Sequence, residues 1–303
     1  MKFEIPASFY EEEVRDGYTV TAQMKKIWAA ELELYAIFAD VCTRHGLRYY
    51  WTYGNLIGAA RHGGFIPWDD DVDVFMPRAD YRKLCAVAQE EFKGKFFFQT
   101  EHTDPGCHIS FAKLRNSETT AILTFEKVNH YRYNQGIFLD IFPLDNFPDD
   151  PEEREAFMKQ IRYYKRKSQS WARMFEGRRV YFGRKVLYAG LPLVYIARAV
   201  IRLLRIPNLP CRKLEALSQK YNDTETNCVA MLGLAEDSAF PRKWLEDTVQ
   251  LPFEFLQVPA PVGYKEMLTA IYGNWETPVR GAAGKCAHDG MIFDTERPYT
   301  DYL

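Results

Sequence analysis

The stretch "GAARHGGFIPWDDDVDVFM" (residues 58–76) places four carboxylates within five positions, directly before an apolar run. These are Asp69, Asp70, Asp71 and Asp73. Carboxylates this close repel one another and raise one another's pKa, so such a cluster is expected either on a solvated turn or around a cation. A solvated turn suits Asp69 and Asp70. Asp73 lies inside the apolar run, where an unpaired charge is costly, and this favours the cation.

A strand over "DVDVFM" (residues 71–76) puts Asp71 and Asp73 on one face, because side chains alternate along a strand. Two carboxylates one strand repeat apart can bind one hard divalent cation or two such cations. Ligands that are all oxygen suit magnesium or manganese. A third acid, Asp140, lies inside the apolar strand candidate "GIFLDIFPLD", and two-metal phosphoryl chemistry commonly takes a carboxylate from a neighbouring strand. An ion pair or a helix cap is the alternative role for Asp140.

The preceding segment, "YGNLIGAARHGG" (residues 53–64), supplies glycines, a short helix and two cationic candidates, Arg61 and His62. A backbone turn that opens a helix offers N–H groups to a phosphate, and a nearby cation neutralises the same phosphate from the other side. Gly54 and Gly58 are weak signals alone. Their place between a strand and the carboxylate pair makes them candidates for phosphate binding.

The order of the predicted elements indicates an α/β or α+β core within about the first 150 residues. Apolar residues recur at helical spacing over residues 21–44, and His45-Gly46 ends that helix. Further strands and helices follow from alternation and from glycine and proline breaks. They cover residues 47–54 (strand), 55–64 (helix), 71–76 (strand), 78–92 (helix), 95–100, 108–115 and 136–145 (strands).

A change of composition after Pro148 divides the rest of the chain. We expect a catalytic core over residues 1–150, a basic helical insertion over residues 151–215, and a C-terminal part over residues 216–303 that completes the catalytic domain. A helix in this last part ends at Gly273.

The insertion carries fifteen Lys or Arg residues between positions 159 and 213, against one acid, Glu176. Its apolar stretch, residues 186–205, has an uninterrupted apolar part of about a dozen residues, short of the ~20 that span a bilayer. Either this helix packs on the core, or it lies on an anionic membrane surface with a break at Pro192. In the second case arginines face lipid phosphates and apolar residues enter the headgroup boundary. The arginines are Arg198, Arg202 and Arg205, and the apolar residues are Leu187, Leu191, Leu193, Val194, Ile196, Val200, Ile201 and Leu204.

Bulk properties describe a globular protein, with 303 residues, 47% hydrophobic and 26% charged. Six scattered cysteines without metal-site spacing indicate small buried residues in a reducing cytoplasm. The acidic N-terminus has no signal-peptide pattern. A net charge of -2 predicts no overall electrostatic attraction to nucleic acid. The sequence predicts a cytoplasmic protein without a nucleic-acid partner, with contact to the inner face of the cell membrane as an option for the basic insertion.

The glycine turn, the carboxylate pair and the third carboxylate together are similar to the polymerase-β type of nucleotidyltransferase fold. Four blocks, in chain order between residues 53 and 278, resemble the LicD family of phosphorylcholine transferases, to which the fukutin-type sugar-phosphate transferases are related. The blocks are "YGNLIGAARHGGFIPWDDDVDVFMPRADYRKL", "FAKLRNSET", "GIFLDIFPLDNFP" and "YGNWETP". The fold that the resemblance implies is α+β, with a mixed sheet and flanking helices, to which the basic helical subdomain is added.

The activity that this resemblance implies is transfer of phosphocholine from CDP-choline to a hydroxyl of a cell-surface glycan or a teichoic-acid or lipopolysaccharide precursor, with CMP leaving. The family's acids fall on Asp69, Asp71, Asp73 and Asp140, which implies a site for Mg²⁺ or Mn²⁺. Its glycine turn falls on Gly54 and Asn55. Family members often have threonine or serine where this chain has Asn55.

Other residues are candidates for substrate contacts. Arg61 or Lys113 could stabilise the leaving nucleotide, and Asp140 could accept the proton of the acceptor hydroxyl. A choline ammonium needs aromatic faces, which Trp68, Tyr53 and the run of residues 96–98 could supply.

Several rival functions use the same residues. The donor could carry another alditol phosphate or sugar phosphate, or the chain could be a nucleotidyltransferase that keeps the nucleotidyl half. A non-enzymatic alternative is a membrane-surface adaptor whose acids bind a structural cation.

Overall fold

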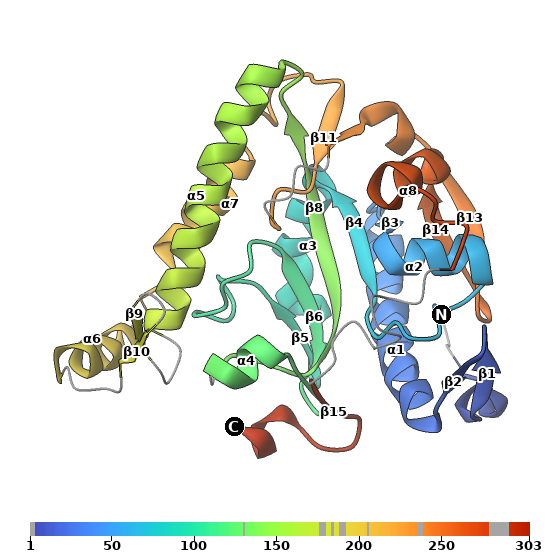
Figure 1. Cartoon of the computed structure of the whole chain (residues 1–303), viewed down its shortest axis with the longest axis horizontal. Coiled ribbons are helices and arrows are strands. Elements are labelled where there is room, and N and C mark those ends of the chain that lie inside the picture. Colours follow the sequence, from blue (N-terminus) through green and yellow to red (C-terminus); the bar gives the residue numbers. More distant parts are fainter. Residues whose placement is uncertain are drawn as a thin grey trace.

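A mixed sheet with helices on both sides forms the body of the protein (Figure 1). The computed structural model describes residues 4–129, 131–175, 180–182, 185–187, 192–204, 206–234, 239–278 and 291–303. Within these ranges, seven strands form the main sheet, in the order β12-β11-β8-β4-β3, with β6 paired to β8 and β5 to β6. The α+β class predicted from the sequence is confirmed.

The central strand is β8 (Ile137–Phe147), whose residues are buried except Asn146, which is half-buried. It runs parallel to β4 (Asp73–Pro77) on one side and antiparallel to β6 (Ala112–Asn116) on the other. Such apolar runs fit a strand covered on both faces. The remaining strands of the sheet are β3 (Tyr50–Trp51), β5 (Phe96–Gln99), β11 (Cys228–Ala230) and β12 (Ala239–Pro241).

The first long helix, α1 (Ala22–His45), covers one face of this sheet (Figure 1). The Thr21 side chain accepts a hydrogen bond from the Met24 N–H at its start, and Gly46 ends it in the left-handed conformation with φ 62°. Both ends agree with the prediction. Buried residues of α1 pack with those of β4 and β8 in one core cluster. They include Trp28, Leu32, Val74, Leu139 and Ile141.

The chain leaves the sheet earlier than the sequence predicted. Residues 47–54 were expected as one strand, but β3 ends at Trp51 because Tyr53 has φ 49°, which turns the backbone out of the extended conformation. Helix α2 (Tyr53–Ile57) starts there and continues as a π-helical turn, η2 (Gly58–His62), which ends at Gly63 with φ 64°. The short helix between glycines is therefore confirmed.

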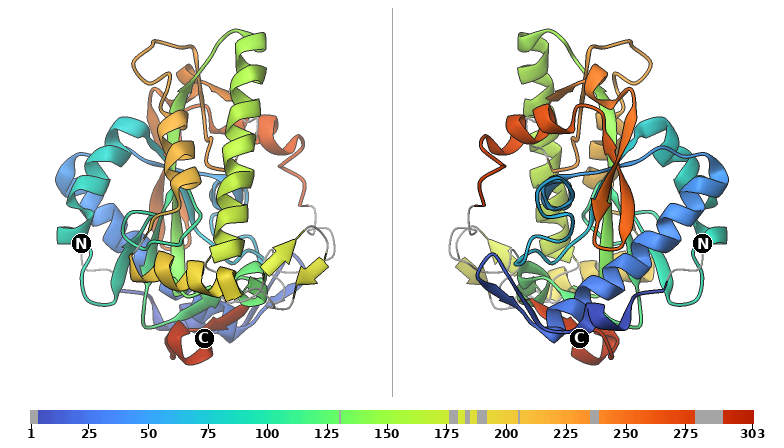
Figure 2. Two further views of the ribbon diagram at one scale, coloured as in Figure 1. Left: turned by 90° about the vertical axis from the view of Figure 1, so that its left-hand side faces the viewer. Right: turned by 90° about the vertical axis from the view of Figure 1, so that its right-hand side faces the viewer.

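Two helices lie along the opposite side of the sheet from α1, as both views show (Figures 1 and 2). These are α5 (Pro151–Phe175) and α7 (Leu209–Ser218), which contact each other. A small hairpin of β9 (Val180–Phe182) and β10 (Lys185–Leu187) follows α5, and α6 (Pro192–Leu203) follows the hairpin. The predicted helix of residues 186–205 thus begins at Pro192 rather than being interrupted there.

The expectation that Arg198 faces lipid phosphates is wrong. Its side chain is buried, and its Nε donates a hydrogen bond of 2.7 Å to the Met174 carbonyl at the end of α5. A buried guanidinium needs such acceptors more than a solvated one does. The other expected membrane contacts at Leu187, Leu191, Leu193, Val194, Arg202 and Arg205 concern side chains outside the described ones.

The C-terminal part adds strands β11 and β12 to the main sheet and then builds a hairpin of β13 (Thr248–Phe253) and β14 (Leu256–Pro261). Helix α8 (Tyr264–Tyr272) follows and ends at Gly273, as predicted. Cys286 lies outside the described residues. The remaining elements are η1 (Ala7–Tyr10), β1 (Glu13–Arg15), β2 (Tyr18–Val20), α3 (Arg78–Glu91), β7 (Thr120–Ile122), α4 (Thr124–Asn129), η3 (Arg242–Leu245), β15 (Ile292–Asp294) and η4 (Tyr299–Tyr302).

None of the helices in the described ranges combines the length and apolarity that crossing a membrane requires. Five cysteines are free thiols. Cys42, Cys107 and Cys211 are buried, and Cys85 and Cys228 are half-buried.

Candidate active site

Three charged residues stand side by side across the middle of the sheet. Asp140 on β8 pairs in register with Asp73 on β4 and, on its other side, with Lys113 on β6, so all three side chains leave the same face. The Lys113 Nζ lies 2.6 Å from the Asp140 Oδ1 and 3.5 Å from the centroid of the Phe138 ring. Asp73 and Asp140 are each 8% exposed. The ion pair and the cation–π contact account for the burial of Lys113.

Asn55 holds the backbone of the carboxylate pair. Its Nδ2 donates a hydrogen bond of 2.7 Å to the Asp71 carbonyl, and its Oδ1 accepts one of 2.6 Å from the Asp73 N–H. The Thr52 N–H also donates to the Asp73 carbonyl at 3.2 Å. Asn55 therefore positions both aspartates. The contact of this side chain with a phosphate stays a prediction.

Gly54 leaves room for a third aspartate. A Cβ at position 54 would lie 2.2 Å from the Asp69 Oδ2, so only glycine permits this approach. The Asp69 carbonyl accepts a hydrogen bond of 2.8 Å from the Trp28 Nε1, which fixes the backbone. The Asp69 Oδ2 is buried and has no hydrogen-bond partner among the described residues. A buried oxygen of this kind is a candidate ligand for a cation.

Burial and mutual repulsion raise the pKa of the site carboxyls. Burial, followed by the Asp71 charge, raises the pKa of Asp69 and Asp73 well above the ordinary range. The Asp140 carboxylate adds to the shift of the Asp73 pKa, while Lys113 opposes it. Bringing a divalent cation to these oxygens would relieve the repulsion.

Glu31 on α1 is a fifth acid of this cluster that the sequence analysis missed. It is 1% exposed, and its pKa is raised well above the ordinary range by burial and then by Asp70, Asp71 and the other aspartates. Its Oε2 has no hydrogen-bond partner in the part of the chain that is described. A signal existed in the sequence, because position 31 falls four residues after Ile27, on the apolar face of the helix.

The candidate ligands of this site are all carboxylate oxygens, which is the ligand type that a hard cation such as Mg²⁺ prefers. Within the described ranges, no group of three or more His, Cys, Asp or Glu side chains is arranged to hold a metal ion by itself. Asp140 is paired with Lys113 instead. Magnesium is commonly held by one or two carboxylates together with substrate phosphate, so Asp71 and Asp73 are the pair that suits it here. Metal binding by these residues stays a prediction.

Arg61 and His62, predicted to bind the nucleotide, have partners within the protein. The Arg61 Nη1 donates a hydrogen bond of 2.5 Å to the Trp275 carbonyl, which joins two of the sequence blocks. The His62 Nε2 lies 2.7 Å from the Asp16 Oδ2, and burial lowers the His62 pKa. A Cβ at Gly58 would lie 2.4 Å from the Gly64 carbonyl oxygen, so Gly58 serves the packing of this turn.

The aromatic residues expected near a choline group pack in the core. The Trp68 ring meets Tyr18 edge to face, and the Tyr53 ring meets Phe75 and Phe142 in the same way. In the 96–98 run, Phe98 stacks on Phe92. Tyr53 also carries the positive φ beside Gly54, and backbone strain of this kind tends to be kept at functional sites.

Comparisons with known proteins agree with the resemblance seen in the sequence. Residues 46–185 match the family model described as "LicD/FKTN/FKRP, nucleotidyltransferase domain". The chain is 26% identical over 259 residues to the lipopolysaccharide cholinephosphotransferase LicD of Haemophilus influenzae, which covers 83% of this chain and 92% of that protein. It is also 28% identical over 122 residues to an uncharacterised protein of Rickettsia prowazekii, covering 39% of this chain and 41% of that protein.

Proposed function

The chain belongs to the LicD family, and from this premise we propose that it transfers phosphocholine from CDP-choline to a hydroxyl of a lipopolysaccharide or related cell-surface glycan, releasing CMP. The observation that carries the proposal is the aspartate pair at the start of β4, with Asp71 just before the strand and Asp73 as its first residue. Asn55 holds the backbone of both, beside Asp140 and Lys113. The name of the Haemophilus relative supports the choice of phosphocholine and of lipopolysaccharide.

The first task of such a transferase is to neutralise the diphosphate of the donor. Asp71 and Asp73 would hold Mg²⁺ or Mn²⁺, which supplies positive charge to the phosphate oxygens when bound. The buried Asp69 oxygen, left without a partner in the described structure, is the next candidate ligand. Lys113 adds a fixed positive charge at the same face of the sheet.

The second task is to place the acceptor hydroxyl in line with the bond that breaks. The acceptor oxygen forms a bond to the phosphorus of phosphocholine, the bond from that phosphorus to the CMP oxygen breaks, and the hydroxyl proton leaves. Asp140 is the base that the geometry favours, because Lys113 fixes its carboxylate in the row beside Asp73.

The test is a panel of CDP-alcohols scored by CMP release. Turnover of CDP-choline supports the proposal, and a preference for CDP-ribitol or CDP-glycerol would move it to another alditol phosphate with the same chemistry. A donor labelled in both halves separates the nucleotidyltransferase alternative, since that enzyme would leave the nucleotide on the acceptor. No CMP release from any donor would favour the adaptor with a structural cation.

A location at the inner face of the cell membrane is part of this proposal. Helix α6 exposes three apolar side chains, Ile196 at 59%, Val200 at 42% and Leu203 at 82%, and Leu204 just after the helix is 64% exposed. The surrounding segment is rich in Lys and Arg, and the combination of exposed apolar and basic residues suits an anionic lipid surface. A lipid-linked acceptor would then be close to the site.

A further inference from the structure

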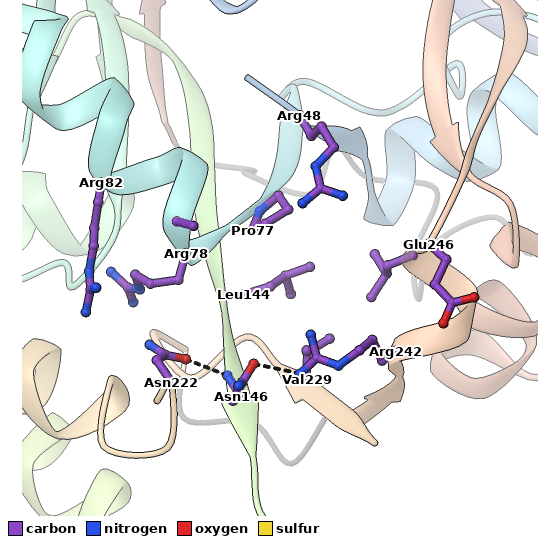
Figure 3. A pocket seen from close by; sticks show the side chains of 12 residues that line it. Arg48, Pro77, Arg78, Arg82, Leu144, Asn146, Asn222, Val229, Arg242 and Glu246 are labelled. Atoms are coloured by element: carbon purple, nitrogen blue, oxygen red, sulfur yellow. Dashed lines mark hydrogen bonds between the residues drawn. The ribbon is translucent and has the colours of Figure 1, made fainter. Parts of the chain in front are cut away.

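A cavity of about 440 Å³ lies at the other end of β4 and β8 from the aspartates (Figure 3). Pro77, the last residue of β4, and Leu144 on β8 line it. Each stands four residues after Asp73 or Asp140, so the cavity is roughly 13 Å along the strands from the carboxylate row. It is therefore a separate feature of the same sheet.

Four arginines and one glutamate line this cavity. Figure 3 shows Arg48 above it, Arg242 below it, Arg78 and Arg82 on one side, and Glu246 on the other. They come from the segment before β3, from α3 and from η3, which are far apart in the sequence. Folding thus gathers the positive charges at one place.

Two of the arginines have acidic partners. Arg78 forms a two-point ion pair with Asp145, with distances of 2.7 and 2.6 Å, and the Arg48 Nε lies 3.4 Å from the Asp80 Oδ2. The two short bonds between Arg78 and Asp145 make a strong ion pair, whereas the single contact between Arg48 and Asp80 is too long to be a strong one. These contacts account for part of the positive charge.

Arg82 and Arg242 have neutral partners instead. Arg82 donates two hydrogen bonds, of 2.9 and 2.6 Å, to the Gln219 Oε1. Arg242 donates to the Thr226 carbonyl and to the Asn146 Oδ1, each at 2.8 Å. Neither forms an ion pair within the described ranges, so both keep their charge uncompensated while their positions are fixed.

The N-terminus of α3 also lines the cavity. Pro77 precedes the helix and makes no side-chain cap, and Arg78 and Ala79 of its first turn are lining residues. The first backbone N–H groups of a helix carry partial positive charge and lack partners within the helix. This end of the helix adds to the attraction for an anion that the arginines create.

We propose that this cavity binds a small molecule bearing a phosphate group, independently of the aspartate site. Guanidinium groups match the geometry of phosphate oxygens, and a helix N-terminus favours the same ligand. The volume lies within the range of small-molecule sites and suits a sugar phosphate or a mononucleotide. The phosphate group that the arginines recognise could belong to a sugar phosphate or to a mononucleotide.

The test titrates pyrophosphate, glucose 1-phosphate and CMP in parallel into the full chain by calorimetry, with EDTA present so that the aspartates repel anions. Arg82→Gln is the main variant, because the one hydrogen-bond partner of this side chain in the described ranges is a neutral glutamine, Gln219. Arg48→Gln is the second variant. Lys83→Gln is the matched control, since it removes one charge from the neighbouring position of α3, outside the cavity lining.

We expect saturable binding of at least one probe at a single site, at least tenfold weaker in Arg82→Gln and Arg48→Gln and within about twofold in Lys83→Gln. Binding of glucose 1-phosphate alone would assign a sugar phosphate, binding of CMP alone a nucleotide, and binding of all three the phosphate itself. No saturable binding of any probe, or an equal loss in Lys83→Gln, overturns the proposal. The outcome of this titration does not affect the proposed CMP release at Asp71 and Asp73, which the CDP-alcohol panel tests separately.

Discussion

The Lys113 ammonium is paired with the Asp140 carboxylate, 2.6 Å away across β6 and β8. Asp140 also stands next to Asp73, so Lys113 is the positive charge that lets two buried carboxylates remain side by side. Its charge lowers the pKa of Asp73 against the combined effect of burial, Asp71 and Asp140. Lys113 therefore connects the stability of the sheet with the charge state of the site.

The first prediction follows from this pair. Lys113→Met keeps the length of the side chain but leaves Asp140 buried without its cation, which should lower the free energy of unfolding by about 3–5 kcal/mol. The double variant Lys113→Met/Asp140→Leu should recover much of that stability, because it removes both charges, and should still release no CMP. Urea unfolding with the CMP assay measures both. A single variant as stable as the wild type would contradict the role given to Lys113.

The second prediction concerns the aspartate pair. Asp71→Asn and Asp73→Asn should each keep the fold and lose nearly all turnover, because they remove charge at constant size. The matched control is Asp223→Asn, at an exposed turn position between α7 and β11, which should keep full activity. Either site variant retaining more than about a tenth of wild-type CMP release, a barrier change of only ~1.4 kcal/mol, would remove the pair from the mechanism.

Parts of this site could be predicted from the sequence because they depend on local pattern. The apolar run around Asp140 marked a central strand, and the strand predicted over residues 71–76 is present as β4. It begins at Asp73, so Asp71 precedes it, and the shared face expected for the two aspartates stays a prediction. The partners of these residues could not be derived. The pairing of β6 with β8 brings Lys113 to Asp140, and no local pattern fixes which strands pair.

Contacts between distant segments could not be predicted from the sequence either. Arg61 reaches the carbonyl of Trp275, 214 positions away, and Arg198 turns inward to the carbonyl of Met174 at the end of another helix. Helical spacing gives the face on which Arg198 lies but not the neighbour that covers it. Glu31 could have been noticed as an acid at an apolar position of α1, but its partners come from a separate loop.

The third prediction is metal dependence. EDTA should stop CMP release, and Mg²⁺ or Mn²⁺ should restore it, since every proposed ligand is an oxygen. The cation should also raise the temperature of unfolding of the wild type and have little effect on Asp71→Asn, a readout that needs no substrate. Activity that returns only with zinc would indicate a Cys or His site, which the described residues do not provide.

The fourth prediction concerns pH. Glu31 has a folded pKa well above its ordinary value of 4.5, so the folded protein holds this proton more tightly than the unfolded chain does. The resulting stabilisation is complete below the ordinary pKa and is lost as the pH rises through the folded pKa. Relative to Glu31→Gln, the wild type should lose up to about 1.4 kcal/mol per pH unit in that window.

Urea unfolding in EDTA, at intervals from pH 4 to pH 9, measures this difference. Glu33→Gln is the matched control, because Glu33 lies on the same helix, is half-buried rather than buried, and pairs with Lys95. Parallel stability curves for the wild type and Glu31→Gln over the whole range would show that Glu31 does not titrate between the two states.

The last prediction concerns α6 and the basic segment around it. The wild type should sediment with vesicles that contain anionic lipid, less so at raised salt, and poorly with neutral vesicles, because each nearby Lys or Arg contributes about 1 kcal/mol of attraction to anionic headgroups. Leu203→Gln and Leu204→Gln should weaken the binding by removing apolar side chains that are 82% and 64% exposed. Val14→Gln, the same kind of change from an apolar to a polar side chain at an exposed position of β1, is the control. If the wild type stays in the supernatant with anionic vesicles at low salt, α6 has no membrane role and its exposed face needs another explanation.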